Sequence, residues 1–365
     1  MAFTATPMVP GDLFDGAAKL AAACDARFAR LAAPTERAGL LAETWREVTA
    51  LGWPAVMVPE ASGGAGGELR DVAALVEGAA RSALALPIGS VCGVVPVLLG
   101  VAPEAAADLL AGIAAGTHRV AAAIAPIHAE AAGSAFELRR KGGAIHADGA
   151  LIGVECPPEP THLLVACSID GEPTLLLLAA EGDSIRLHER IDFRHTLDLH
   201  CAGDRPLAAT ILARGAEVGA ATARAIRCGA FLACVEAAAA MGAVLEQTIA
   251  YLSGRIQFDA PLASFQVLRH KVADLYAEQE RARAQVSELI ERIAAGEWPE
   301  REIDLAKLHL GPAARRFGAA VIQLHGGMGM TEEMPATRLS KRLLMVEFEY
   351  GDAAFHEARL LAATA

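Results

Sequence analysis

Several residues in the C-terminal third of the sequence have side chains or backbone suited to binding a charged or polar ligand. Arginine offers a permanent charge and forked donors that match phosphate oxygens, and a glutamine amide can both donate and accept hydrogen bonds. Two adjacent glycines allow a backbone to approach a ligand closely, although they also end helices. A lone arginine or glutamine is more often a solvated surface residue. The candidates are Arg255, Gln266 and the run Gln323, Leu324, His325, Gly326 and Gly327.

Cysteine and histidine form no pattern that indicates a metal site. The seven cysteines lie at positions 24, 92, 156, 167, 201, 228 and 234, and no two have CxxC spacing. The histidines show no metal-ligand spacing with them, so we assign no metal. The cysteine usage predicts a reducing compartment, and the N-terminal residues lack the basic region of a signal peptide. We therefore expect a cytoplasmic protein.

The composition favours a large, mostly helical protein that does not bind nucleic acid. A chain of 365 residues suggests two or three domains, and the long alanine-rich stretches favour helix. The net charge of -12 argues against a nucleic-acid partner. The longest apolar run, 81–101, is interrupted by Pro87, Gly89 and Pro96, so we expect no membrane span.

The apolar periodicity divides the chain into helical, β and helical parts. Between about 119 and 212, short apolar runs alternate with turn dipeptides such as Asp148-Gly149, which predicts antiparallel strands. Helical spacing precedes them, and four longer patterns follow at 217–252, 265–294, 303–325 and 336–349. We predict an α+β multidomain protein: an α-helical N-terminal domain (1–117), a small antiparallel β middle domain (118–215) and a C-terminal four-helix bundle (216–365).

Three segments of this pattern resemble the acyl-CoA dehydrogenase family. "LGWPAVMVPEASGGAGG" is similar to the family's N-terminal "elG…vPEeyGGaG" loop. "RIQFDAPLASFQVLRHKVADL" is similar to "R.qFG.pi..fQ…laDm", and "AVIQLHGGMGMTEEMPATRLSKR" is similar to "a.qihGG.Gyt.eyp.eRl.Rd". The last two matches are long and specific, and the three occur in the family's order over nearly the whole chain. The resemblance implies the family's α–β–α fold.

The same resemblance implies a flavoprotein in which FAD lies at a subunit interface. It assigns Arg255 to a phosphate of FAD, Gln266 to a hydrogen bond with the cofactor, and the run 323–327 to the adenine side. It implies an acyl-CoA thioester as substrate: a glutamate removes the Cα proton while the flavin N5 accepts a hydride from Cβ. An electron-transfer flavoprotein then takes the electrons. His325 is expected to be a structural donor rather than a catalyst.

The expected catalytic glutamate is missing from this sequence. The family's "YEGT" register places Tyr350 at the glutamate, and an ordinary tyrosine, with a pKa near about 10, is a poor base at neutral pH. Glu349 lies one residue out of register, which on a helix is a rotation of about 100°. The other family location for the base falls near Cys228–Ala230 and holds no acid, while Glu236 lies further on.

The β domain also departs from the segments that hold the flavin ring. Of the family's "TEP..GSD" segment, only Pro126, Gly133 and Ser134 remain. Gly153 stands where a tryptophan is expected, and Glu155 stands where a threonine is expected. Glycine cannot flank the ring, and a buried glutamate beside it would disfavour the reduced, anionic flavin.

These departures leave three hypotheses. In the first, the chain is one subunit of a heteromeric acyl-CoA dehydrogenase, and a homologous partner supplies the flavin stacking and the base. The family includes such α2β2 enzymes for steroid side chains and dicarboxylic acyl-CoAs. The second is a homomeric dehydrogenase with a relocated base, Glu349 or Glu347. The third is a non-catalytic scaffold that keeps only the fold.

Overall fold

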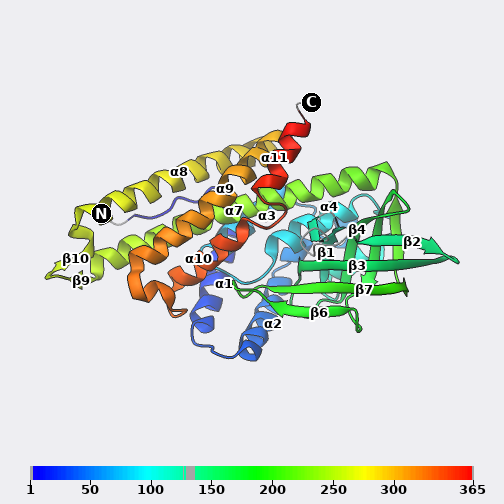
Figure 1. Cartoon of the computed structure of the whole chain (residues 1–365), viewed down its shortest axis with the longest axis horizontal. Coiled ribbons are helices and arrows are strands. Elements are labelled where there is room, and N and C mark those ends of the chain that lie inside the picture. Colours follow the sequence, from blue (N-terminus) through cyan, green and yellow to red (C-terminus); the bar gives the residue numbers. More distant parts are fainter. Residues whose placement is uncertain (1–2, 126, 129–135, 364–365) are drawn as a thin grey trace. The chain divides into compact units, whose positions relative to one another are not determined.

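The computed structural model describes residues 3–125, 127–128 and 136–363, without the side chains of 202–205 (Figure 1). Helices are followed by a β-sheet and then by further helices, which confirms the predicted fold class. Packing divides the chain into two compact units. One contains residues 1–33, 69–84 and 230–365, and the other contains 34–68 and 85–229. The three-domain division at 117 and 215 stays a prediction.

The first unit is built from helices. The residues 217–252, 265–294 and 303–325 are helical as predicted, but the last predicted helix ends at Val346 rather than at 349. Glu349 and Tyr350 therefore lie in a turn beyond the end of α10 (Pro335–Val346), so the helical rotation expected between these two residues is wrong. The helices of this unit are α1 (Asp12–Phe28), α3 (Leu69–Ala80), most of α7 (Ala216–Gly254), α8 (Gln266–Ala294), α9 (Glu300–His325), α10 (Pro335–Val346) and α11 (Ala353–Ala362).

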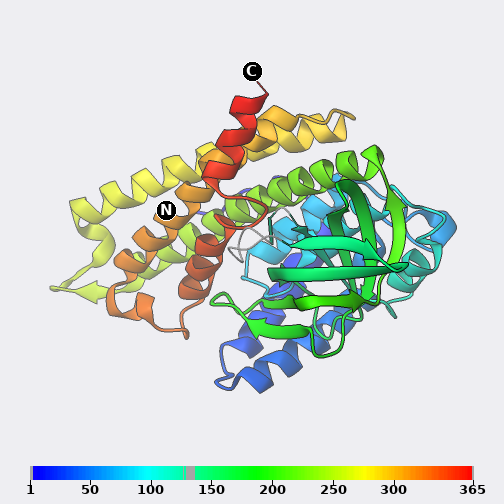
Figure 2. The same cartoon turned by 45° about the vertical axis from the view of Figure 1, so that its right-hand side comes forward.

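The second unit contains an eight-stranded sheet (Figure 2). Seven strands run in the order β6-β7-β3-β2-β4-β5-β8, and β1 pairs with β4. The strands are β1 (Val120–Ile124), β2 (Glu137–Lys141), β3 (Ala144–Glu155), β4 (His162–Ile169), β5 (Glu172–Ala179), β6 (Ile185–Glu189), β7 (His195–Leu207) and β8 (Thr210–Arg214). Its helices are α2 (Pro34–Ala50), η1 (Trp53–Ala55), η2 (Glu60–Ser62), η3 (Ser90–Val94), α4 (Val95–Leu99) and α5 (Ala107–Ala114).

The sheet is mixed, which corrects the predicted antiparallel domain. β1 pairs with β4 in parallel, and β2 meets β4 in parallel at Leu138 and Ile169, while the remaining pairs are antiparallel. The β2–β3 hairpin lies between β1 and β4 in the chain, so the chain can return to β1 in the parallel sense. Apolar side chains such as Leu151, Leu163 and Leu176 are fully buried in the core.

Strands also occur outside the predicted β region. β9 (Ile256–Gln257) and β10 (Ala260–Pro261) form a two-stranded hairpin between α7 and α8, with η4 (Leu262–Ser264) following. The strands are too short to show period-two alternation, so the sequence pattern could not reveal them.

Helix α7 is the apolar centre of the fold. Among the described residues it is the one helix long and apolar enough to cross a membrane, but its most apolar stretch is entirely buried inside the protein. The core helix of a folded domain has the same length and composition, and this burial favours that interpretation.

A glycine allows the close approach of α1 and α3. A Cβ at Gly78 would lie 2.4 Å from the carbonyl oxygen of Phe14. We predict that Gly78→Ala lowers the stability of the protein by about 1–3 kcal/mol, because one backbone must move away from the other. Gly39→Ala is the matched control, since a Cβ there meets nothing and alanine favours helix by about 0.5–1 kcal/mol. Thermal unfolding of both variants should give shifts of opposite sign.

Candidate functional site

Arg255 and Gln266 lie at the junction of α7 and α8. The amide of Leu262 donates to the carbonyl of Arg255 at 2.9 Å, which closes the β9–β10 hairpin at its base. Gln266 then begins α8. The structure thus places two of the predicted binding residues at either end of one short connection.

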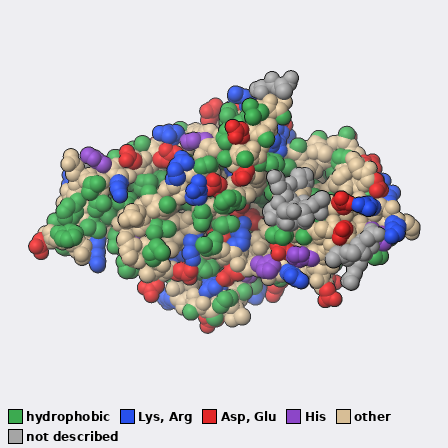
Figure 3. Space-filling view, viewed as in Figure 1, with side chains coloured by type: hydrophobic (Ala, Val, Ile, Leu, Met, Phe, Trp, Pro, Cys, Tyr) green, Lys and Arg blue, Asp and Glu red, His purple; other side chains and the backbone are tan. Residues whose placement is uncertain are grey.

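This junction presents an exposed apolar surface beside Arg255, an arginine that forms no ion pair with the described residues. Hydrophobic side chains gather at the end of the molecule that carries β9 and β10 (Figure 3), and Phe258 is 85% exposed. Arg255 is exposed and makes no ion pair with any described residue. Phe258 and Asp259 both have left-handed backbone conformations, with φ of 55° and 59°, which are costly for residues other than glycine. Exposed apolar surface and retained strain both indicate a binding surface.

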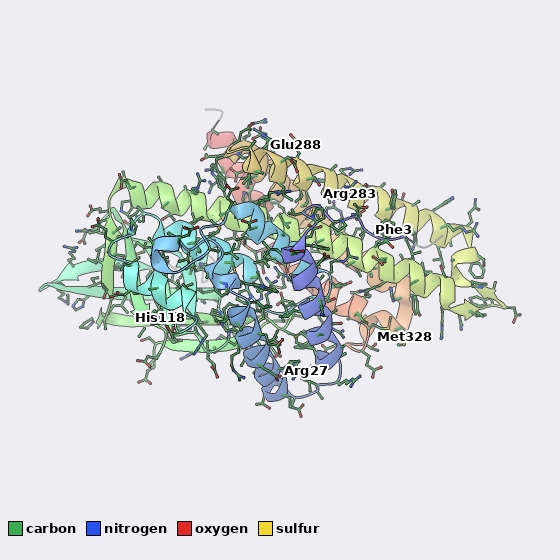
Figure 4. All side chains as sticks on the ribbon, turned by 180° about the vertical axis from the view of Figure 1, so that it is seen from behind. Phe3, Arg27, His118, Arg283, Glu288 and Met328 are labelled. Atoms are coloured by element: carbon green, nitrogen blue, oxygen red, sulfur yellow. The ribbon has the colours of Figure 1, made fainter. Side chains whose placement is uncertain are left out.

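The second element is the corner at the end of α9. Gln323 is exposed, whereas Leu324 and His325 are buried. Gly326 has φ of 60°, and a Cβ on Gly326 or Gly327 would meet nothing within 4 Å. The corner therefore offers a ligand the Gln323 side chain and glycine backbone, but not the side chains of Leu324 and His325. Met328 follows and is 39% exposed (Figure 4).

His325 has a structural environment, as expected. The Thr248 hydroxyl donates to the carbonyl of Val244 at 2.6 Å, so it can only accept from His325 Nε2, 3.2 Å away. This assigns the Nε2–H tautomer, which leaves Nδ1 as a buried acceptor without a partner among the described residues. Burial lowers the pKa of His325, which keeps the ring neutral.

The turn at the expected catalytic position is bound by ion pairs. Arg342 Nε and Nη2 each donate to Glu236 at 2.7 Å, and Nη1 donates to Glu349 at 2.6 Å. Arg342 is only 2% exposed. Burial opposes its charged form, but the carboxylates of Glu236 and Glu349 raise the pKa of Arg342 well above its ordinary value. Glu349, the candidate relocated base, is thus committed to a buried arginine, and Glu347 pairs with Arg315.

A buried lysine fixes the same turn through its backbone. Lys307 is 1% exposed, and its Nζ donates to the carbonyls of Glu347 at 3.0 Å and Gly351 at 2.7 Å. Burial lowers the pKa of Lys307, and nearby carboxylates act in the opposite direction. These two bonds join α9 to both ends of the turn.

A buried histidine holds the middle of the turn. His356 is completely buried, with Nδ1 2.8 Å from Asp304 Oδ1 and Nε2 3.1 Å from the carbonyl of Tyr350. Tyr350 has φ of 54°, a strained conformation that persists because its neighbours hold it. Asp352 is explained by helix capping, since its carboxylate accepts from Phe355 N at 2.9 Å at the start of α11.

The structure shows the surroundings of the two β-unit positions, 153 and 155, at which the sequence departs from the resemblance. Gly153 has φ of 73° and lies where the register of β3 against β7 shifts. Glu155 is buried, but Oε1 lies 3.1 Å from Arg194 and 3.3 Å from Arg190, so its charge is compensated. The expected effect of a buried Glu155 on a reduced flavin stays a prediction, and the two arginines would weaken that effect.

The remaining motif positions of the β unit, Pro126, Gly133 and Ser134, lie outside the described residues. Elsewhere in the β unit, a cavity of about 450 Å³ is bounded by Ala166 of β4, by Phe136 just before β2 and by Thr222 at the start of α7. It could hold an apolar chain, but nothing in its described lining would hold a phosphate.

Pattern reasoning missed the residues that organise these sites. Arg342, Lys307, His356 and Tyr251 act through burial and through partners distant in sequence. Tyr251 lies four residues before Arg255, and Arg342 ends the third family-like segment, but neither position indicates which contacts the side chain makes.

Comparison with known proteins identifies the family. The C-terminal domain model of acyl-CoA dehydrogenases matches residues 219–363, and the N-terminal domain model matches residues 17–117. Together they span more than half of the chain, which belongs to the acyl-CoA dehydrogenase family. Acyl-CoA dehydrogenase IpdE2 of Mycolicibacterium smegmatis is 28% identical over 288 residues, covering 78% of this chain and 75% of the relative.

Solved structures share the fold over almost the whole chain. The ChsE4–ChsE5 complex from Mycobacterium tuberculosis has a TM-score of 0.77 at 19% identity, covering 98% of this chain and 99% of the other. A variant of the Tcur3481–Tcur3483 steroid ACAD has a TM-score of 0.78 at 22% identity, covering 96% and 99%.

The residues at the α7–α8 junction and the α9 corner fit the nucleotide part of FAD, the cofactor of this family. The fit rests on an uncommitted arginine, exposed glutamine amides and an open glycine corner. On the flavin-ring side, Gly153 provides no aromatic wall. The described residues thus fit one half of the cofactor better than the other.

The arginine at the turn generates a stability prediction. Arg342→Met should destabilise the protein by about 3–5 kcal/mol, because two buried carboxylates lose their counter-ion. Arg281→Met is the control: this arginine pairs with Glu278 but is 61% exposed, so its loss should cost less than about 1 kcal/mol. Urea unfolding measures both. Adding Glu236→Gln to Arg342→Met should recover part of the loss, and equal effects of the two arginine variants would contradict the assignment.

Proposed function

We propose that this chain is a subunit of a heteromeric acyl-CoA dehydrogenase and contributes a nucleotide half-site for FAD to an active site completed by a homologous partner. The observation that carries the proposal is the buried arginine at the turn. Arg342 binds both Glu236 and Glu349, the acids nearest the expected base. A general base must be free to reach the substrate proton, and both carboxylates are instead hydrogen-bonded to the buried arginine.

The proposed half-site uses three features of this chain. Arg255 would bind a phosphate of FAD, and Gln266 would form a hydrogen bond with the cofactor. Gln323, Gly326 and Gly327 would approach the adenine side, with Leu324 and His325 supporting the corner from beneath. FAD, when bound, supplies hydride acceptance, while the residues of this chain bind and orient it.

The substrate class and the partner follow from the same proposal. The substrate would be an acyl-CoA thioester, and the partner would supply the base and the flavin stacking. The relatives include a steroid enzyme and a complex of two named chains, which supports a heteromeric dehydrogenase of lipid or steroid catabolism. An electron-transfer flavoprotein as acceptor and a cytoplasmic location stay predictions.

The alternative is a homomeric dehydrogenase that uses Glu349. It requires Glu349 to leave Arg342 and the turn to leave the bonds from Lys307 and His356. The third hypothesis, a scaffold without cofactor, does not explain why an uncommitted arginine and an open glycine corner are kept. For the experiments below, each alternative predicts a different outcome from the heteromeric proposal.

The role of Glu349 is tested in the assembled complex. We expect the chain expressed alone to bind FAD poorly and to dehydrogenate no acyl-CoA. Glu349→Gln should leave the activity of the complex within about tenfold, since a missing general base would cost about 10²–10⁴-fold. The measurement is acyl-CoA-dependent reduction of an artificial electron acceptor across a panel of acyl-CoAs. A loss of several powers of ten with FAD still bound would identify this chain as the catalytic subunit.

The half-site is tested by FAD retention. Arg255→Ala should lower the FAD content of the purified complex, because a charge-assisted bond to phosphate is lost. The absorbance spectrum gives FAD per complex. Arg269→Ala is a control from the start of α8 at the same junction, where Arg269 Nε donates to the carbonyl of Ala263 at 2.7 Å. Unchanged FAD occupancy in Arg255→Ala would show that the half-site is wrongly assigned.

A further inference from the structure

Tyr251 lies between the two elements of the proposed half-site. Thr248 and Tyr251 lie three residues apart near the end of α7 and share one helix face, and Arg255 follows directly after the helix ends at Gly254. The corner at the end of α9 packs on that face, and Thr248 receives the hydrogen bond of His325. Tyr251 is thus the central residue of the three.

Two contacts join Tyr251 to the α9 corner. Its hydroxyl donates to the carbonyl of His325 at 3.3 Å, and its ring stacks on the His325 ring with centroids 4.4 Å apart and planes at 15°. The last four carbonyls of a helix have no partner within the helix. The hydroxyl satisfies one of them and so fixes the direction in which the backbone leaves α9 toward Gly326.

A third contact joins Tyr251 to the hairpin. The amide of Arg255 donates to the carbonyl of Tyr251 at 2.9 Å, which is the last α-helical bond before the chain turns into β9. The same residue therefore bonds to the segment that carries the arginine and to the segment that carries the glycine corner.

The histidine at the corner depends on this stacking. Among the described residues, Nδ1 of His325 is buried without a hydrogen-bond partner, and the Nε2 bond to Thr248 is a single neutral contact. Burial lowers the pKa of His325, so no charge helps to hold the ring. The Tyr251 ring and hydroxyl therefore add a direct restraint on the corner that we assign to the adenine side.

We propose that Tyr251 is a positioning residue for the nucleotide half of FAD. It holds the His325–Gly327 corner at a fixed distance from Arg255, so both elements meet one nucleotide without further ordering. The proposal rests on the proposed function, because it needs Arg255 and the corner to bind the same FAD. A preorganised site loses less conformational freedom on binding, so the loss of Tyr251 should weaken affinity without changing which groups touch the cofactor.

The test is a titration of the FAD-depleted assembled complex with FAD, followed by fluorescence quenching. Tyr251→Phe keeps the ring and removes the hydroxyl, and it should raise the Kd about three- to tenfold, the effect of one neutral hydrogen bond. Tyr251→Leu also removes the stacking and should raise the Kd further. Tyr276→Phe is the matched control, because the Tyr276 hydroxyl makes no hydrogen bond to the described residues.

A merely structural role would give a different result. If Tyr251 positions the corner, saturating FAD should restore the wild-type stoichiometry and visible spectrum in Tyr251→Phe, and Tm without FAD should fall little. A reduced stoichiometry together with a large loss of Tm would assign Tyr251 to general stability and overturn the proposal. A wild-type Kd in Tyr251→Phe would also overturn it. If Arg255→Ala itself leaves the Kd unchanged, the proposed function fails instead.

Discussion

The helical unit is organised around one buried arginine that forms ion pairs with two carboxylates. Arg342 joins α10 to α7 through Glu236 and to the following turn through Glu349, all at positions almost closed to water. A buried charge must be paired, so loss of the arginine alone would leave two buried carboxylates without a counter-ion. The position of the turn follows from this pairing, and Lys307 and His356 then fix its backbone from α9 and α11. The result is a segment held by its surroundings, at one of the two places where the resemblance leads us to expect the catalytic glutamate.

The order of helices and strands could be predicted because apolar periodicity is a local signal. α7, α8 and α9 were recognised to within a few residues, since each repeats an apolar stripe over many turns. The parallel pairing of β1 with β4 could not be predicted, because pairing direction depends on how the chain returns to the sheet. The β9–β10 hairpin was missed because two-residue strands have no periodicity.

The candidate site could be predicted only where residues match a motif or lie close in sequence. Arg255, Gln266 and the glycine corner were found by resemblance, and the structure shows why they suit a ligand: they are exposed and uncommitted. The ion pair that binds Glu349 could not be predicted from the sequence. It belongs to a three-residue cluster in which Arg342 also binds Glu236, 106 residues before that arginine. Likewise, the pairing of Glu155 with Arg190 and Arg194 could not be predicted, because both arginines lie on another segment.

The division into two units affects how the chain can fold during synthesis. Residues 1–33 and 69–84 belong to the same unit as residues 230–365, although the whole sheet is made between them. Domains generally fold as units while the chain emerges from the ribosome, N-terminal parts first. Here the first helices to emerge cannot complete their core until the last third of the chain is made. The apolar faces of α1 and α3 are therefore exposed to chaperones or to misassembly for most of translation, although they come first in the sequence.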